Sequence, residues 1–314
     1  ATTDRPPSPL VPSMLPFKVI YHPQYDLDLG PHVFPSQKFR LIHDALLAEG
    51  IAEASDFLQP QPAPDEDILR VHTAAYVEKL KTDSLTLSER MKLEIPLSEA
   101  SREGFWLAAG GSMLTGSKAL EAGFAANLSG GFHHAYPGHG EGFCMIHDVA
   151  VAIRNLQASG KIRTAMTVDT DVHHGNGTAA IFANDPSVFT LSIHQENNYP
   201  MPKPPSDEDI GLDDGTRDHE YLDALEEGLL RSLKKMTPDI IFYVGGADPY
   251  REDQLGGLAL TMEGLQRRDR LVFDHARRRG IPVASTLAGG YARHVADTVR
   301  IHVNTILAAR EVFR

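Results

Sequence analysis

The 314-residue chain is 42% hydrophobic, so it can bury a large core, and disorder is not its expected state. Its formal net charge of −12 is spread over many short stretches, which argues against direct nucleic-acid binding and favours cationic substrates or basic protein tails. The single cysteine, Cys144, excludes an intramolecular disulfide and a four-thiolate metal site, and it fits a reducing compartment.

The chain contains no apolar run of the roughly 18 residues that a membrane span needs. It also has no basic-then-apolar start of the kind that marks a secretory signal. We therefore expect a soluble, cytoplasmic protein.

Residues 1–16 are rich in proline and small polar residues, which cannot form a continuous helix, and they predict a flexible or surface-draped arm. From 17 to 314, short apolar runs alternate with longer amphipathic stretches, as in a parallel sheet covered by helices. The predicted strands are FKVIYH, AANLSG, AMTVDTDV, VFTLSIH, DIIFYVGG and PVASTLAGG. Because no repeat or internal linker divides this region, we expect a single α/β domain, with an open, mostly parallel sheet and helices on both faces.

Several predicted helices end in a glycine, the usual stop signal just past the last helical turn. These glycines are Gly50, Gly123, Gly160 and Gly280. The later strands instead run into polar or glycine-rich segments, namely GGFHH, DTDVHHGNG, SIHQENN, GGADPY and AGGY. Ligands of open parallel sheets bind outside the carboxyl ends of the strands, so we expect these segments to converge on one pocket.

Three residues that can bind a metal alternate in the segment VDTDVHH, namely Asp169, Asp171 and His173. Alternating side chains of an extended segment share one face. Catalytic zinc takes three nitrogen or oxygen ligands and keeps one open position. Asp248 is the best third ligand, because a carboxylate at the end of an apolar run is costly without a cation. The predicted zinc site is Asp171, His173 and Asp248. Each residue alone is better explained as a helix cap or a buried polar group, but the whole arrangement is not.

A histidine pair and a tyrosine follow glycine pairs at two other strand ends. His133 and His134 can serve as general base and acid, because the pKa of imidazole lies near neutrality. Tyr291 follows Gly289 and Gly290, which let the backbone approach a ligand, and its phenol can donate to a developing oxyanion. A histidine pair or a glycine-glycine-tyrosine turn is weak evidence when it stands alone.

Four segments together resemble the active-site motifs of the histone deacetylase family, in the same order: GGFHHAYPGHGEGFC, VDTDVHHGNGTA, GGADPYREDQLGGL and LAGGYA. The resemblance runs from about residue 17 to the C-terminus and is greatest to class IV and its bacterial single-domain relatives. Those relatives also have segments similar to VHTAAYV and VIYHPQY. The resemblance implies an arginase- or deacetylase-like fold and a zinc-dependent lysine deacylase.

The resemblance also implies roles for individual residues. The zinc ligands would be Asp171, His173 and Asp248. His134 would be the general base, His133 would stabilise charge, and Tyr291 would polarise the substrate carbonyl.

Further roles implied by the resemblance lie around these groups. Asp169 would support His133, and its backbone, with Asp171, His173 and Ser192, would form an internal K⁺ site. Phe143, which follows Gly142, would form one wall of the acyl-lysine tunnel. Tyr199, just before Pro200, would form the other wall.

The sequence departs from the family pattern at three places. Asn176 stands where many class I members have an aspartate that supports the second histidine, and an amide offers no negative charge. The stretch 97–104 provides no match for the surface acid that grips the substrate backbone. The long dimerisation insertion of acetylpolyamine amidohydrolases is missing, which favours a monomer.

The leading hypothesis is hydrolysis of acetyl- or longer acyl-lysine in a protein or peptide. A small acylated amine, such as an acetylpolyamine, would undergo the same chemistry. A catalytically silent metal-binding interaction domain is disfavoured, because binding alone would not need His133, His134 and Tyr291. A binuclear manganese hydrolase of the arginase type is also disfavoured, because Asp248 and Asp253 do not clearly provide a second metal site.

Overall fold

The computed structural model describes residues 14–314. Most of the arm predicted at 1–16 lies outside the described residues. Leu15, near the end of this segment, is 3% exposed and joins the hydrophobic core, as does Phe17. Packing of the described chain against the core therefore begins at Leu15.

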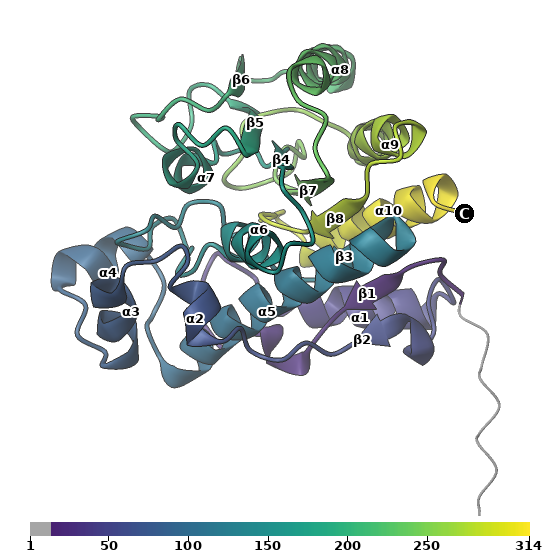
Figure 1. Cartoon of the computed structure of the whole chain (residues 1–314). Helices are drawn as coiled ribbons and strands as arrows, with labels where there is room; N and C mark the ends of the chain where they lie inside the picture. Colours follow the sequence, from purple (N-terminus) through teal and green to yellow (C-terminus); the bar gives the residue numbers. More distant parts are fainter. Residues whose placement is uncertain (1–13) are drawn as a thin grey trace, which may run out of the picture.

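One sheet contains every strand of the described chain, in the order β2-β1-β3-β8-β7-β4-β5-β6, and neighbouring strands are parallel throughout (Figure 1). The strands are β1 (Lys18–Ile20), β2 (Phe57–Leu58), β3 (Phe124–Asn127), β4 (Ala165–Asp169), β5 (Val188–Gln195), β6 (Glu208–Leu212), β7 (Ile240–Val244) and β8 (Val283–Thr286). The six predicted strands are present as β1, β3, β4, β5, β7 and β8.

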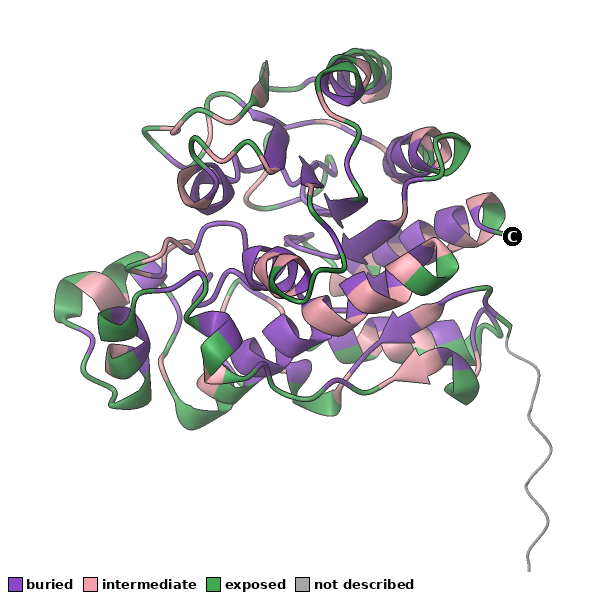
Figure 2. Ribbon diagram, viewed as in Figure 1, coloured by how far each residue is buried: buried purple, intermediate pink, exposed green. Residues whose placement is uncertain are grey.

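The two strands that were not predicted, β2 and β6, are the edge strands of the sheet. β2 has two residues, too few to show a pattern. β6 reads EDIGL and is only partly buried, because an edge strand meets solvent and tolerates charge. The central strands are apolar and buried, as sheets covered on both faces require (Figure 2).

Helices cover both faces of the sheet (Figure 1). On one face α8, α9, α10 and α1 pack in sequence against one another, and α5 and α6 pack together on the other. The helices are α1 (Lys38–Ala48), α2 (Asp65–Ile68), α3 (Ala74–Lys81), α4 (Leu87–Leu93), α5 (Glu99–Ala122), α6 (Asp148–Ala158), α7 (Asn176–Ile181), α8 (Asp218–Lys235), α9 (Met262–Arg278) and α10 (Val295–Val312). Two short 3-10 helices span Pro23–Tyr25 and Ala54–Asp56.

The predicted stop signals lie at the ends of α1, α5, α6 and α9. All four glycines have a positive φ, between 64° and 85°, a conformation that glycine adopts without strain: Gly50, Gly123, Gly160 and Gly280. α8 and α10 lack such a glycine.

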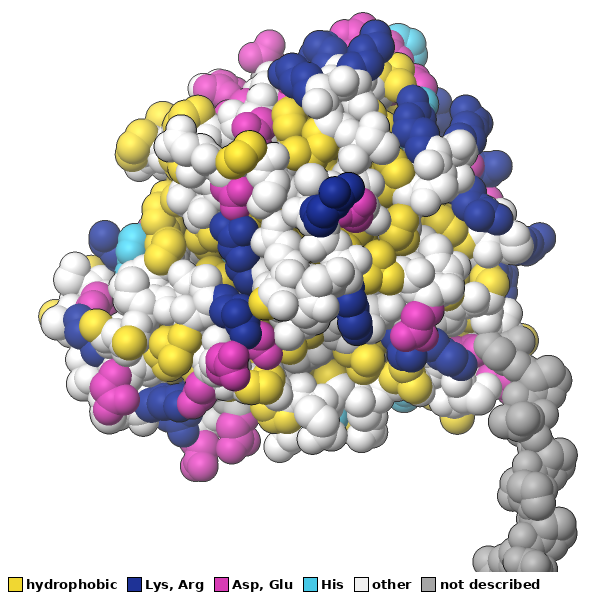
Figure 3. Space-filling model, viewed as in Figure 1, with side chains coloured by type: hydrophobic (Ala, Val, Ile, Leu, Met, Phe, Trp, Pro, Cys, Tyr) yellow, Lys and Arg dark blue, Asp and Glu magenta, His cyan; other side chains and the backbone are white. Residues whose placement is uncertain are grey.

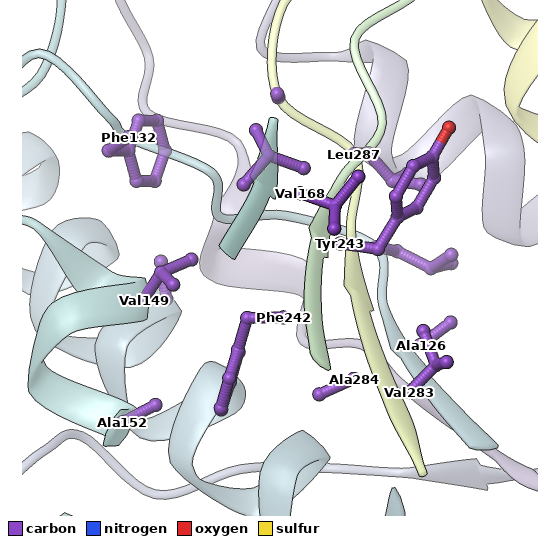
Figure 4. Packing of buried hydrophobic residues seen from close by; sticks show 14 of the residues in the cluster. Ala126, Phe132, Val149, Ala152, Val168, Phe242, Tyr243, Val283, Ala284 and Leu287 are labelled. Carbon is purple, nitrogen blue, oxygen red and sulfur yellow. The ribbon is translucent and has the colours of Figure 1, made fainter. Parts of the chain in front are cut away.

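The core joins the central strands to the helix layers. Phe242 of β7 is buried on the side of the sheet that α5 and α6 cover, where Figure 4 also labels Val149 and Ala152 of α6. The next residue, Tyr243, faces the other layer, and its ring lies 5.2 Å from that of Phe273 of α9. Burying an aliphatic or aromatic side chain of this size contributes about 1.5–3 kcal/mol to folding. The sheet is therefore a rigid base for the loops at its carboxyl edge.

The polar segments that follow the strands meet at this edge, as predicted. The backbone N–H of Gly289, after β8, donates to Asp171 Oδ2, after β4, at 2.9 Å. The backbone N–H of Ala247, after β7, donates to the carbonyl of Gly289 at 2.9 Å. The N–H of Thr178 donates to the carbonyl of His133 at 3.2 Å. Segments more than 100 residues apart in sequence thus form one site.

A buried arginine supports two of these loops from behind. Arg268 of α9 donates through Nη1 to the carbonyls of Gly246, at 2.6 Å, and Thr170, at 3.2 Å. Its Nη2 donates to Asp269 Oδ1 at 2.7 Å, which pairs the buried charge. The guanidinium therefore joins the loop after β7 to the loop after β4.

The surface seen in Figure 3 carries Lys and Arg side chains interspersed with Asp and Glu side chains. No helix within residues 14–314 is long and apolar enough to cross a membrane.

Candidate active site

The three predicted metal ligands lie together at the carboxyl edge of the sheet. β4 ends at Asp169, so Asp171 and His173 occupy the loop after the strand rather than the strand itself. His173 Nδ1 lies 3.0 Å from Asp171 Oδ1 and 3.4 Å from Asp248 Oδ2. One ligand atom from each residue lies within 4.8 Å of the others, a spacing that one metal ion can bridge.

The carboxylates of this group are fixed by backbone donors. Asp171 Oδ1 accepts from the N–H of His173 at 3.0 Å, and Asp248 Oδ1 accepts from the N–H of Val172 at 2.9 Å. Asp248 Oδ2 is buried and has no hydrogen-bond partner among residues 14–314. A buried carboxylate oxygen without a donor is costly, so this oxygen fits a cation ligand.

The charge around these residues also favours a cation. Burial lowers the pKa of His173, but the carboxylates of Asp171 and Asp248 outweigh it and raise this pKa to about 10. Burial and the charge of Asp171 raise the pKa of Asp248 to about 7. In the metal-free protein a proton on His173 thus partly neutralises the two carboxylates.

Two glycines make room for the carboxylates. A Cβ at Gly289 would clash with the side chains of Asp248 and Asp171, and a Cβ at Gly246 would contact the same two residues. The missing side chains let the backbone of both loops close around the ligand atoms. The donor set and the space around it fit a zinc ion held by Asp171, His173 and Asp248.

His133 lies beside this group and is paired with Asp169. Its Nδ1 is 2.6 Å from Asp169 Oδ2, and its Nε2 is 3.7 Å from Asp171 Oδ1. Burial lowers the pKa of His133, but Asp169 and Asp171 outweigh burial and raise it to about 9. His133 is therefore positively charged at neutral pH.

His134 has the opposite electrostatic environment. Its Nδ1 lies 2.6 Å from Asn176 Oδ1, so its support is an amide, as the sequence indicated. Burial, followed by the positive charges of His133 and His173, holds the pKa of His134 well below its usual value. His134 is therefore neutral at neutral pH and able to accept a proton.

Tyr291 completes the group of predicted catalytic residues. Its ring lies 6.5 Å from the ring of His173 between centroids. Its backbone N–H donates to Asp253 Oδ2 at 2.7 Å, which anchors the turn. Burial, and then the charges of Asp171 and Asp248, raise the pKa of the phenol well above 10, so Tyr291 keeps its proton and can donate it in a hydrogen bond.

A cavity of about 210 Å³ leads to these residues. It brings the predicted tunnel walls together with two histidines of the site and the tyrosine; its lining residues are Glu94, His134, Gly142, Phe143, His173, Asn198, Tyr199, Leu255 and Tyr291. A wider hollow of about 650 Å³ adjoins it and shares Glu94 and Tyr199. The hollow is also lined by Leu87 and Met91 of α4, which are exposed.

Ser192 is placed beside Asp169 by the sheet register, because the two residues are partners across β4 and β5. Its hydroxyl lies 3.0 Å from His194 Nδ1. Asp169 Oδ1 accepts from the N–H of Asp171 at 3.1 Å. These contacts do not test whether the group binds K⁺, so the K⁺ site stays a prediction.

Sequence reasoning missed four residues at the site. Glu94 lines the cavity three residues before the stretch 97–104, where we sought a surface acid. Asp253, considered only as a metal ligand, accepts hydrogen bonds from backbone N–H groups, including that of Tyr291. The fully buried Lys38 donates to the carbonyl of Ala288 at 2.7 Å and faces the Tyr291 ring.

Glu141, the fourth missed residue, hydrogen-bonds to the side chain of Asn176. It stands inside the histidine segment GGFHHAYPGHGEGFC, next to Gly142. The signal in the sequence was an acid two residues before a predicted tunnel wall. Its partner lies 35 residues away, so the pairing could not be inferred from spacing.

A second group within the described chain could also hold a metal ion, namely His174, His194 and Asp209. His174 Nε2 lies 3.0 Å from Asp209 Oδ1, and the side chain of Asp209 is 34% exposed. Neither of the cavities that contain Tyr199 is lined by these residues. The contact joins edge strand β6 to the loop after β4.

Comparison with known proteins places this arrangement in a family. A histone deacetylase domain matches residues 32–306. An uncharacterized protein of Picosynechococcus is 42% identical over 95% of this chain and 99% of its own length. Histone deacetylase 2 of Arabidopsis thaliana is 29% identical over 90% of this chain and 77% of its own. The crystal structure of an HDAC homolog complexed with SAHA covers 94% of this chain and 84% of its own, with a TM-score of 0.80 and 26% identity.

The parallel α/β fold and these similarities define an amidohydrolase of the deacetylase type. The chain belongs to the histone deacetylase family, as its four motifs predicted. Its buried group of two aspartates and one histidine is consistent with zinc.

If this group binds zinc, replacing Asp171, His173 or Asp248 with alanine should abolish turnover and lower the zinc content, because a three-ligand site tolerates no missing ligand. Asp209→Ala, from the second group, is the matched control and should retain zinc. Metal analysis of the purified variants provides the measurement. Full zinc in all three site variants would refute the assignment.

Zinc affinity should also depend on pH. Because the pKa of His173 is about 10 in the metal-free protein, binding at neutral pH must displace its proton. Affinity should therefore rise by about tenfold per pH unit between about pH 7 and 8. Below about pH 7 the dependence should steepen, because Asp248, with a pKa of about 7, also gains a proton. Competition with a chelator measures the affinity, and a pH-independent value would contradict this ligand set.

Proposed function

We propose that the protein is a zinc-dependent deacylase that hydrolyses the amide of acetyl- or longer acyl-lysine in a protein or peptide. The observation that carries the proposal is the cavity of about 210 Å³, which joins Phe143 and Tyr199 to His134, His173 and Tyr291. Two aromatic walls can contact the methylene groups of a lysine side chain. The polar groups lie where the amide of such a side chain would arrive.

Zinc, when bound by Asp171, His173 and Asp248, would supply an activated water molecule and polarise the substrate carbonyl. His134 is neutral and uses Nδ1 to contact Asn176, which leaves Nε2 to accept a proton and later return it to the leaving amine.

His133 and Tyr291 would act on charge rather than on proton transfer. His133, held by Asp169, would place a positive charge beside the reacting group when its imidazole is protonated. The phenol of Tyr291 would donate a hydrogen bond to the oxygen that becomes negative in the transition state. The remaining proposals are a K⁺ ion near Asp169 and Ser192, a monomeric state and a cytoplasmic location.

A second candidate function is hydrolysis of a small acylated amine such as an acetylpolyamine. It is favoured by the carboxylates of Glu94 and Glu141, which both line the outer hollow and would attract free ammonium groups. The fold and the catalytic groups would serve either substrate.

A substrate panel separates these functions. We expect the zinc-loaded protein to show higher kcat/KM on acetyl- and longer acyl-lysine peptides than on acetylated polyamines, and a hydroxamate to inhibit it by chelating the metal. Turnover of polyamines alone would favour the second candidate. If the loaded protein cleaves neither class, a non-catalytic interaction domain becomes the better explanation.

Tyr291→Phe tests the proposed oxyanion donor, because it removes one hydroxyl and keeps the ring. Loss of one oxyanion donor costs on the order of 10²–10³ in kcat, and we expect a loss of this size with little change in KM. Zinc content and melting temperature serve as controls and should stay near the wild-type values. Normal turnover in this variant would show that the tyrosine only closes a turn.

A further inference from the structure

We propose that Glu141 is a positioning residue that sets the tautomer of His134 through the side-chain amide of Asn176. The kinetic consequence rests on the proposed function, in which His134 is the base. Many class I enzymes support this histidine with a carboxylate, which Asn176 cannot supply. In this chain Glu141 would supply the carboxylate, one hydrogen bond further away.

The three side chains form a chain of hydrogen bonds. Asn176 Oδ1 lies 2.6 Å from His134 Nδ1, and Asn176 Nδ2 donates to Glu141 Oε1 at 2.6 Å. The side chain of Glu141 is 17% exposed, so water competes weakly for its oxygens. Glu141 is fixed by a tight turn in which its backbone pairs with Cys144, at 3.1 and 2.9 Å.

The order of donors and acceptors follows from the carboxylate. Burial raises the pKa of Glu141, but hydrogen bonds from His139, Tyr199 and Asn176 outweigh burial and lower it, so the group is ionised at neutral pH. An ionised carboxylate only accepts hydrogen bonds. Asn176 must therefore present its NH₂ group to Glu141 and its carbonyl oxygen to His134.

This amide orientation determines which nitrogen of His134 carries the proton. Facing a carbonyl oxygen, Nδ1 must be protonated, and Nε2 then has the free lone pair that a general base needs. With the amide reversed, Nδ1 would accept a hydrogen bond and Nε2 would carry the proton. In that tautomer Nε2 has no lone pair with which to accept another proton.

In every side-chain contact of Glu141 its carboxylate can act as the acceptor, which keeps the Asn176 NH₂ group directed toward it. Oε1 also accepts from the Tyr199 hydroxyl at 2.9 Å, and Oε2 lies 3.0 Å from His139 Nε2. One carboxylate oxygen thus serves both the tunnel wall and the amide behind His134. Glu141 acts through Asn176, and so it is a positioning residue rather than a catalytic one.

The decisive experiment exchanges the amide and the carboxylate. Glu141→Gln leaves two amides, and neither then has a fixed orientation. Asn176→Asp leaves two carboxylates at hydrogen-bond distance, which must share a proton. In the double variant, the amide introduced at position 141 donates to the carboxylate introduced at position 176, and that carboxylate accepts from His134 in the required order.

We expect each single variant to lose about 10- to 100-fold in kcat with little change in KM, since general acid–base groups contribute about 10²–10⁴-fold. The double variant should recover to within about tenfold of wild type. Losses that multiply in the double variant would overturn the proposal, because independent structural defects combine in that way.

Nitrogen NMR of the His134 ring in the zinc-loaded protein tests the tautomer without using activity. The wild type should carry its proton on Nδ1, and Glu141→Gln should give a mixture. Glu94→Gln is the matched control, because it removes a carboxylate from the same outer hollow and should leave the tautomer unchanged. A pure Nδ1–H form in Glu141→Gln would overturn the proposal. An inactive wild type with the expected spectra would instead refute only the proposed function.

Discussion

The site is organised around two carboxylates, Asp171 and Asp248, that are buried within reach of each other at the end of a parallel sheet. Such a pair is unfavourable unless donors and a cation compensate it. Backbone N–H groups satisfy one oxygen of Asp248 and both oxygens of Asp171, while the second oxygen of Asp248 has no hydrogen-bond partner in the described chain. The raised pKa of His173 results from Asp171 and Asp248, and the raised pKa of His133 results from Asp169 and Asp171.

The two adjacent histidines differ because their supports differ. His133 faces a carboxylate, Asp169, and keeps its proton, whereas His134 is buried, faces an amide and lies beside the positive charges of His133 and His173. The two adjacent histidines thus differ in charge at neutral pH, because His133 is protonated and His134 is neutral. Glu141 extends the second support by one hydrogen bond, and its acceptor character determines the amide orientation.

The sequence was sufficient for the parallel sheet and for the gathering of Asp171, His173 and Asp248, because apolar runs that end in polar segments specify both strand and site. It was insufficient for β2 and β6, which are short or charged edge strands. Lys38 and Glu141 were missed for another reason. Their roles depend on partners far away in sequence, at Ala288 and Asn176, and one sequence does not reveal such pairings.

Gly289 joins two parts of the site that would otherwise be separate. Its N–H binds Asp171, its carbonyl binds Ala247, and Tyr291 follows two residues later. The segment that presents the phenol is thus held by the residue proposed to bind metal. Exchange of this loop with that of a relative, whether by recombination or by design, would transfer the tyrosine and disturb the metal ligands together. The loops after β4, β7 and β8 should therefore be inherited as one unit.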